Sequence, residues 1–136
     1  MSDFILDTNV LIRCLRGISE TLDLARTLTE EGDLHISVLS QLEVLTLAQP
    51  QEEKRTLDFL TPFILHPVNE LIAHRAATLL KSAGPARPLY FSEAIIAATA
   101  LQHGLVLVTY GPGNLQRVSE LKLYPLPAAS ISRGMT

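Results

Sequence analysis

Short apolar runs alternate along this chain with longer segments whose apolar residues recur at helical spacing. The runs cover residues 4–6, 34–38, 63–65 and 105–109. Segments of this length and apolar content are typical of buried strands, and strands alternating with helices are typical of parallel sheets with helices on both faces. We therefore predict an α/β fold with three layers, α/β/α, around a mostly parallel central sheet, with residues 122–126 as an added edge strand.

The chain has the length of one domain. Its 136 residues contain no internal repeat and no linker, so we predict a single domain over residues 1–126 and a C-terminal tail over residues 127–136. Helical patterns follow each apolar run, and they cover residues 9–16, 19–30, 37–49, 51–61, 69–82, 91–103 and 114–121.

Composition restricts the class of protein. Apolar residues make up 47% of the chain and the net charge is −3, which indicates a folded protein without a basic nucleic-acid coat. A metal-dependent nuclease remains compatible, since such a site is itself acidic. The single cysteine, Cys14, cannot form an internal disulfide, which suits a reducing compartment. We expect its side chain to be a small buried apolar group. No apolar run is long enough for a bilayer, so we expect a cytoplasmic protein with no membrane partner.

Asp7 is the first candidate for chemistry. It follows the apolar run 4–6 directly, and ligands of α/β proteins bind outside the carboxyl ends of the strands. The alternative is structural, because Asp7 or Thr8 can equally cap the helix that begins there.

Two further carboxylates lie among apolar neighbours. Glu43 is embedded in residues 38–45, and Glu93 opens the most apolar helix of the chain. A carboxylate in such surroundings needs compensation, and three on separate segments could hold Mg²⁺ or Mn²⁺, which prefer oxygen ligands. Each has a structural alternative: an exposed helix face for Glu43, and a favourable charge at a helix N-terminus for Glu93.

A resemblance to a known family favours the metal site. The opening Asp-Thr-Asn-Val-Leu-Ile at residues 7–12 resembles the first motif of the PIN-domain ribonucleases, best known as toxins of VapBC-type toxin–antitoxin modules. Glu43 resembles the family's second acid, and residues 93–109 resemble its third-acid helix with the following strand. The motifs follow one another in the family's order along nearly the whole chain.

The chain departs from the family pattern in two places. The third acid is usually aspartate but is Glu93 here, and the acidic positions after the last strand are Gly111 and Asn114. The resemblance implies Asp7, Glu43 and Glu93 as ligands of one tightly held metal, with Asn114 as a weaker fourth catalytic member that helps to place the metal or the water.

Other polar residues lie near these motifs. Thr8, Asn9 and Thr109 adjoin the acids and could orient a carboxylate or a phosphate, although capping and strand propensity explain the threonines equally well. Arg13, Arg16 and Arg87 are candidate contacts to RNA or to a partner, or they are solvated surface charges. The four histidines lack the spacing of zinc ligands.

The resemblance implies a divalent-metal-dependent endoribonuclease that hydrolyses RNA phosphodiesters as the toxin of a type II toxin–antitoxin module. It further implies a homodimer, and an antitoxin whose C-terminal segment covers the acidic cleft. A catalytically weakened module that binds RNA or protein is the main alternative, because Gly111 and Asn114 replace acids. A metal-dependent phosphatase or DNA nuclease could use the same three acids.

Overall fold

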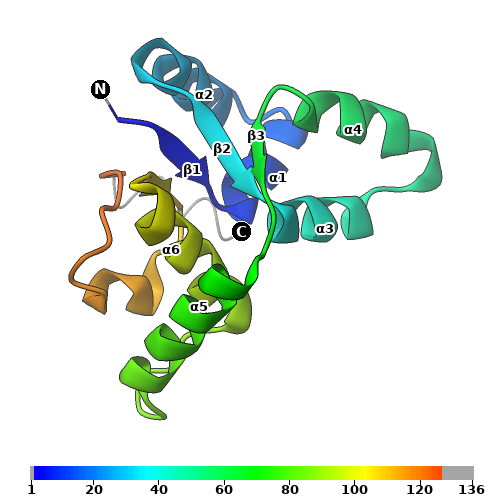
Figure 1. Cartoon of the computed structure of the whole chain (residues 1–136). Coiled ribbons are helices and arrows are strands. Elements are labelled where there is room, and N and C mark those ends of the chain that lie inside the picture. The colour runs from blue at the N-terminus through cyan, green and yellow to red at the C-terminus, as the bar shows by residue number, and fades with distance from the viewer. Residues whose placement is uncertain (1, 127–136) are drawn as a thin grey trace.

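The computed structural model of the chain describes residues 2–126, and the predicted tail over residues 127–136 lies outside that range. Four strands form one sheet in the order β3-β2-β1-β4, and every pair is parallel (Figure 1). The strands are β1 (Phe4–Leu6), β2 (Leu34–Ser37), β3 (Ile64–His66) and β4 (Val106–Val108). The sheet grows from β1 in one direction to β2 and β3 and in the other to β4. The strand order therefore reverses between β1 and β4.

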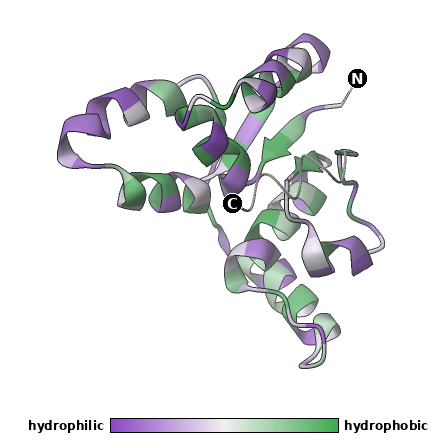
Figure 2. Ribbon diagram, turned by 180° about the vertical axis from the view of Figure 1, so that it is seen from behind, coloured by the Kyte–Doolittle hydropathy of each residue, from purple (hydrophilic) through white to green (hydrophobic). Residues whose placement is uncertain are grey.

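Four helices cover one face of the sheet. They are α1 (Thr8–Leu15), α2 (Ser19–Glu31), α3 (Val38–Leu47) and α4 (Glu53–Leu60), the last preceded by the 3₁₀ helix η1 (Pro50–Glu52). Side chains of β1 alternate between the faces: Phe4 and Leu6 pack with Val10, Leu28 and Leu60 from this helical layer. Seen from behind, α2 and α4 carry long hydrophilic stretches on their outer turns (Figure 2).

The opposite face is covered by α6 (Phe91–His103), with α5 (Glu70–Ala83) packed outside it and the 3₁₀ helix η2 (Gly113–Arg117) beside it (Figure 1). Ile5 of β1 points into this layer, against Ile96 and Ala97 of α6. Helix α6 is buried along most of its length, which is why its sequence has almost no polar face. The structure thus confirms the three-layer α/β/α prediction.

The two edges of the sheet are finished differently. The predicted strand over residues 122–126 forms one parallel bridge, from Leu107 to Leu123, with Tyr124 N donating to the carbonyl of Leu107 at 2.8 Å. The next residue, Pro125, has no N–H with which to extend the pairing. At the other edge, β3 is three residues long and lies between Pro62 and Pro67.

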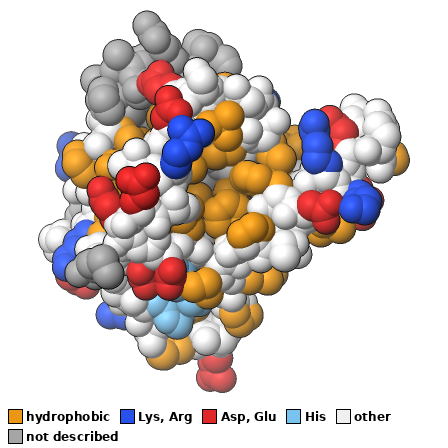
Figure 3. All heavy atoms as spheres, turned by 90° about the horizontal axis from the view of Figure 1, so that it is seen from above, with side chains coloured by type: hydrophobic (Ala, Val, Ile, Leu, Met, Phe, Trp, Pro, Cys, Tyr) orange, Lys and Arg blue, Asp and Glu red, His pale blue; other side chains and the backbone are white. Residues whose placement is uncertain are grey.

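The region of η1 and α4 stands away from the body of the molecule. Figure 3 shows charged side chains on this projecting arm and hydrophobic side chains where the arm meets the body. Within residues 2–126, no helix is long and apolar enough to cross a membrane.

Candidate active site

Asp7 lies at the point where the strand order of the sheet reverses. Its backbone N–H donates to the carbonyl of Val108 at 3.0 Å, which ties the end of β1 to the end of β4. Its Oδ1 accepts a hydrogen bond from Thr8 N at 2.8 Å, so Asp7 is indeed the N-cap of α1. Capping uses only one oxygen, and Oδ2 accepts a bond from the hydroxyl of Thr109 at 2.7 Å. The structural and chemical interpretations of Asp7 are therefore compatible.

Thr109 holds this carboxylate in place at the centre of a hydrogen-bond network. It directly follows β4, its side chain is buried, and its hydroxyl donates to Asp7 while accepting from Asn9 Nδ2 at 3.1 Å and Gly111 N at 3.3 Å. Asn9 in turn accepts a bond from Tyr110 N at 3.2 Å. Each group in the network has its partner, so the position of Asp7 Oδ2 is set by both strand ends.

Glu43 joins the site through Thr8. Helix α3 begins at the side-chain cap of Ser37, whose Oγ accepts from Leu39 N, and this start places Glu43 on the turn that faces α1. The buried hydroxyl of Thr8 lies 2.8 Å from Glu43 Oε1 and 2.9 Å from Ser40 Oγ. Because a carboxylate only accepts, the single hydroxyl proton of Thr8 goes to Glu43. Thr8 thus links the first two acids, with its backbone on Asp7 and its side chain on Glu43.

Glu93 lies in the first turn of α6 and is partly exposed. Its Oε1 accepts a hydrogen bond from Tyr90 N at 2.9 Å, which caps the helix much as the structural alternative proposed. Oε2 has no hydrogen-bond partner among residues 2–126, so Glu93 keeps one oxygen for a ligand.

The pKa of Asp7 is influenced by both of the other acids, Glu43 and Glu93. Burial raises the pKa of the Asp7 carboxyl, and the hydrogen bonds from Thr109 and Thr8 N oppose that effect. The negative charges of Glu43 and Glu93 raise the pKa of Asp7 further. The three carboxylates therefore repel one another across the site, and a bound cation would relieve that repulsion.

The donor set fits a hard divalent ion, although it does not form a closed cage. Within the described part of the chain, no three His, Cys, Asp or Glu side chains stand close enough together to hold an ion unaided. Mg²⁺ tolerates this, since it usually keeps several waters and binds one or two carboxylates together with substrate phosphates. Asp7 and Glu43 are joined through Thr8, and Glu93 can act through water.

The remaining predicted residues lie elsewhere. Asn114 is the second residue of η2, and its side-chain amide donates to the carbonyl of Pro88 at 2.9 Å, which holds the loop before α6 in place. Arg13 is buried: it donates to Thr21 at 2.8 Å and its guanidinium lies 4.1 Å from the centre of the Tyr110 ring. This corrects the expectation that Arg13 contacts RNA or a partner. Arg16 and Arg87 are exposed.

Two residues of the site escaped the sequence analysis. Ser40 is fully buried and hydrogen-bonded to Thr8, and Tyr110 is buried with its ring against Arg13 and its hydroxyl 2.9 Å from Thr21. Ser40 stands three residues before Glu43, one helical turn away, and that spacing was the available signal.

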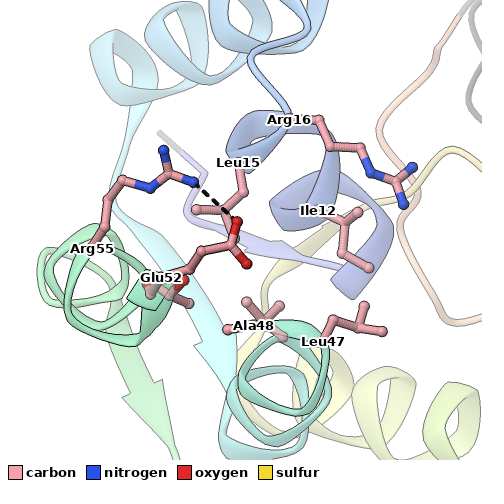
Figure 4. A pocket seen from close by; sticks show the side chains of 9 residues that line it. Ile12, Leu15, Arg16, Leu47, Ala48, Glu52 and Arg55 are labelled. Carbon is pink, nitrogen blue, oxygen red and sulfur yellow. Dashed lines mark hydrogen bonds and ion pairs between the residues drawn. The ribbon is translucent and has the colours of Figure 1, made fainter. Parts of the chain in front are cut away.

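A groove runs from the acids between α1, α3 and the η1–α4 segment. One hollow of about 260 Å³ has Ile12 and Leu15 on one wall and Leu47 on the other, with Arg16 and the Glu52–Arg55 ion pair at its rim (Figure 4). A second hollow shares Ile12 and Leu47 and reaches Thr8 and Glu43. Leu42 and Leu47 are about 60% exposed. We call this apolar channel the α1–α3–α4 groove.

A parallel α/β sheet that brings carboxylates together where its strand order reverses defines a class of small proteins with an acidic, cation-attracting cleft. The chain belongs to one family in that class: the model of the PIN domain matches residues 4–121.

Relatives and solved structures agree with this assignment. The chain is 29% identical over 119 residues to ribonuclease VapC10 of Mycobacterium tuberculosis, covering 87% of this chain and 90% of that protein. It resembles a toxin–antitoxin complex from Klebsiella pneumoniae, with a TM-score of 0.75, 27% identity and coverage of 90% and 99%. VapBC2 from Rickettsia felis, solved on a DNA fragment of its promoter, has the same fold, with a TM-score of 0.79, 16% identity and coverage of 92% and 99%.

Proposed function

We propose that this protein is a divalent-metal-dependent endoribonuclease that acts in the cytoplasm as the toxin of a type II toxin–antitoxin module. The observation that carries the proposal is the arrangement of Asp7, Thr8, Glu43 and Thr109 at the strand ends, with two carboxylates held by hydroxyl donors and repelling each other. Membership of the PIN domain family and the likeness to a protein described as a ribonuclease support it.

In the proposed site Asp7, Glu43 and Glu93 hold Mg²⁺ or Mn²⁺. The bound ion would activate water and stabilise the charge that develops on the phosphodiester. The chain's own contribution is to keep the ligands in place: Thr109 fixes Asp7 Oδ2, Thr8 fixes Glu43 Oε1, and Asn9 satisfies Thr109. The amide nitrogen of Asn114 is engaged with Pro88, so we assign any role in placing the metal or the water to its carbonyl oxygen.

The proposed partners follow from the groove and the family. An antitoxin segment would bind in the α1–α3–α4 groove, where exposed leucines lead towards Glu43, and its end would cover the acids. One solved structure that the chain resembles is described as a toxin–antitoxin complex and another as a member of a family of toxin–antitoxin systems, which supports such a partner. A homodimer is proposed from the family resemblance.

The test is cleavage of a mixed RNA pool with Mg²⁺ or Mn²⁺ and with EDTA, comparing the wild type with Asp7→Asn. Asparagine preserves the helix cap, so this variant should fold. Asp58→Asn is the matched control, because Asp58 is exposed and its one ion pair among residues 2–126 is with Lys54. We expect metal-dependent cleavage by the wild type and the control, and loss in Asp7→Asn. Equal cleavage by all three proteins, or cleavage that persists in EDTA, would refute the proposal.

A second candidate is a PIN-domain module that binds RNA or protein without cutting it. It is favoured by Gly111, which has no side chain, and by Asn114, whose amide is committed to Pro88. Binding of RNA and a Mn²⁺-dependent rise in melting temperature that requires Asp7, without cleavage, would support this candidate. Offering single-stranded DNA and a phosphate monoester in parallel separates a ribonuclease from a DNA nuclease or phosphatase.

A further inference from the structure

Another hollow, separate from the α1–α3–α4 groove and with a volume of about 460 Å³, lies between α5, the loop over residues 84–90, and η2 with the turn that follows it. Three arginines from three separate segments line it: Arg75 on α5, Arg87 in the loop and Arg117 at the end of η2. Thr78 and Ser82 add hydroxyl groups, and Glu120 is the single acid in the lining. A concave site with convergent guanidinium groups matches the chemistry of phosphate recognition.

The positive charge of the chain is concentrated around this hollow. Ten of the eleven lysines and arginines lie within residues 2–126. Arg13 is buried, and three others form ion pairs, Arg26 with Asp23, Lys54 with Asp58 and Arg55 with Glu52.

Six cations have no ion pair among the described residues, and four of them lie on the segments that build the hollow: Arg75, Lys81, Arg87 and Arg117. Lys122 follows two residues after the last lining residue, Glu120, and the sixth is Arg16. In a chain with a net charge of −3, this separation of unpaired cations onto one side is a specific feature of the surface.

Two exposed aromatic residues lie in the chain between the loop of the hollow and the third acid. Tyr90 and Phe91 are 77% and 76% exposed, and in the sequence they follow Arg87 and precede Glu93. Arg87 and Glu93 are six positions apart, so their backbones are at most about 22 Å apart. Solvent-exposed rings next to cations are typical of surfaces that stack unpaired bases and bind the phosphates of a single strand.

The loop that carries Arg87 is fixed to the segment that leads from the site. Asn114 lies five residues after Thr109, and its amide donates to Pro88 O at 2.9 Å. This bond joins the loop before α6 to η2, the two segments from which Arg87 and Arg117 line the same hollow. The binding surface is therefore preformed by a contact between two segments that both adjoin the acids.

We propose that the Arg75–Arg87–Arg117 hollow, together with Tyr90 and Phe91, binds the single-stranded flank of the RNA substrate beside the scissile bond. The flank leaves the acids over the two rings, which stack its bases, and its phosphates then enter the arginine hollow. This inference rests on the proposed function, since it assigns a path to the substrate of the same site.

The test is a binding measurement in EDTA, so that it does not depend on cleavage. A fluorescent single-stranded RNA oligonucleotide is titrated with the full-length protein at several salt concentrations. The Arg87→Gln, Arg117→Gln double variant is compared with the control Arg26→Gln, Arg55→Gln, which removes the same charge from exposed sites elsewhere.

We expect the Arg87, Arg117 variant to bind at least about tenfold more weakly than the control, with the slope of log K against log salt reduced by about 1.4, or about 0.7 for each lost phosphate contact. The Tyr90→Ser, Phe91→Ser variant should lose about tenfold in affinity with an unchanged salt slope, because stacking releases no counterions.

Any of three results would overturn the inference. The first is that the wild type does not bind RNA, and the second is that the Arg87, Arg117 variant binds RNA as tightly as its control. The third is that the Tyr90→Ser, Phe91→Ser variant changes the sedimentation behaviour of the protein while its RNA binding is unaltered. The last result would assign the rings to a protein interface. Failure of the nuclease proposal is a separate outcome, since it shows as absent metal-dependent cleavage by a wild type that still binds RNA through these residues.

Discussion

Replacing Thr109 by valine tests the central claim about the site, that a buried hydroxyl holds an ionised Asp7. Valine has the same shape and the same preference for extended backbone, so the change removes only the hydroxyl. A hydrogen bond to a charged acceptor contributes about 1.5–3 kcal/mol, and the loss also leaves Asn9 Nδ2 without its acceptor. We expect the metal-free protein at pH 8 to lose about 2 kcal/mol of unfolding free energy.

The loss should depend on pH with a defined sign. Burial raises the pKa of Asp7 in the folded state, so its ionisation destabilises the fold as pH rises through that value. The Thr109 hydroxyl lowers this pKa, and without it the ionised form costs more. The difference in stability between wild type and Thr109→Val should therefore grow with pH. At a pH where Asp7 is protonated, it should fall to about 1 kcal/mol, the value of a neutral hydrogen bond.

The assay is urea unfolding with EDTA present, at a series of pH values between 5 and 8. Thr99→Val is the matched control, because Thr99 is equally buried but donates to the carbonyl of Ile95 on its own helix, with no carboxylate involved. Its cost should not change with pH. A loss in Thr109→Val below about 0.5 kcal/mol would refute the assignment, since it would fall within the range of an ordinary surface substitution. A loss that becomes smaller as pH rises would also refute it, because its sign would be opposite to that expected for a hydroxyl that stabilises the ionised carboxylate.

Three further predictions concern the scaffold. Arg13→Ala should lower the unfolding free energy by about 3 kcal/mol in chemical denaturation, because it removes a buried cation–π contact and a hydrogen bond to Thr21. Arg16→Ala, the exposed control, should change the unfolding free energy by no more than about 0.5 kcal/mol, and equal losses in the two variants would contradict the burial of Arg13. Gly104 ends α6 with φ at 65°, and a Cβ there would meet no atom, so Gly104→Ala should cost only the backbone strain of about 1 kcal/mol, seen as a melting temperature a few degrees lower. Burial and the neighbouring His103 and His35 lower the pKa of His66, so the unfolded chain takes up protons first and stability should fall as pH drops below about 6.5. His66→Gln should lose less stability than the wild type between pH 7 and pH 5, and an identical pH profile would contradict this.

Most of the fold could be read from the sequence, because strands buried on both faces are continuous apolar runs and leave little ambiguity. The run at residues 4–6 coincides with β1. The run at 63–65 is displaced by one residue from β3, since Phe63 N donates to Leu60 O and ends α4 instead of joining the sheet. Local periodicity contains no information about that choice.

The site was predictable where it depends on strand ends and unpredictable where it depends on loops. Asp7 and Thr109 adjoin neighbouring parallel strands, so their proximity follows from the sheet order. The partner of Asn114 is Pro88, 26 residues away in an irregular loop, and no spacing rule indicates it. The expectation that Arg13 lies on the surface was wrong, because α1 has only eight residues and packs against α2. It therefore buries more of its circumference than its pattern of polar residues suggests.

The two prolines around β3 bear on how this protein behaves in a crowded solution. β3 is the free edge of the sheet, and Ile64 and Leu65 on it are more than 40% exposed, a combination that invites strand addition by another chain. Pro62 and Pro67 stop any such pairing from extending beyond three residues, because neither can donate a backbone hydrogen bond. The edge can thus make apolar contacts through Ile64 and Leu65 while it resists the continuous strand pairing that a fibril requires.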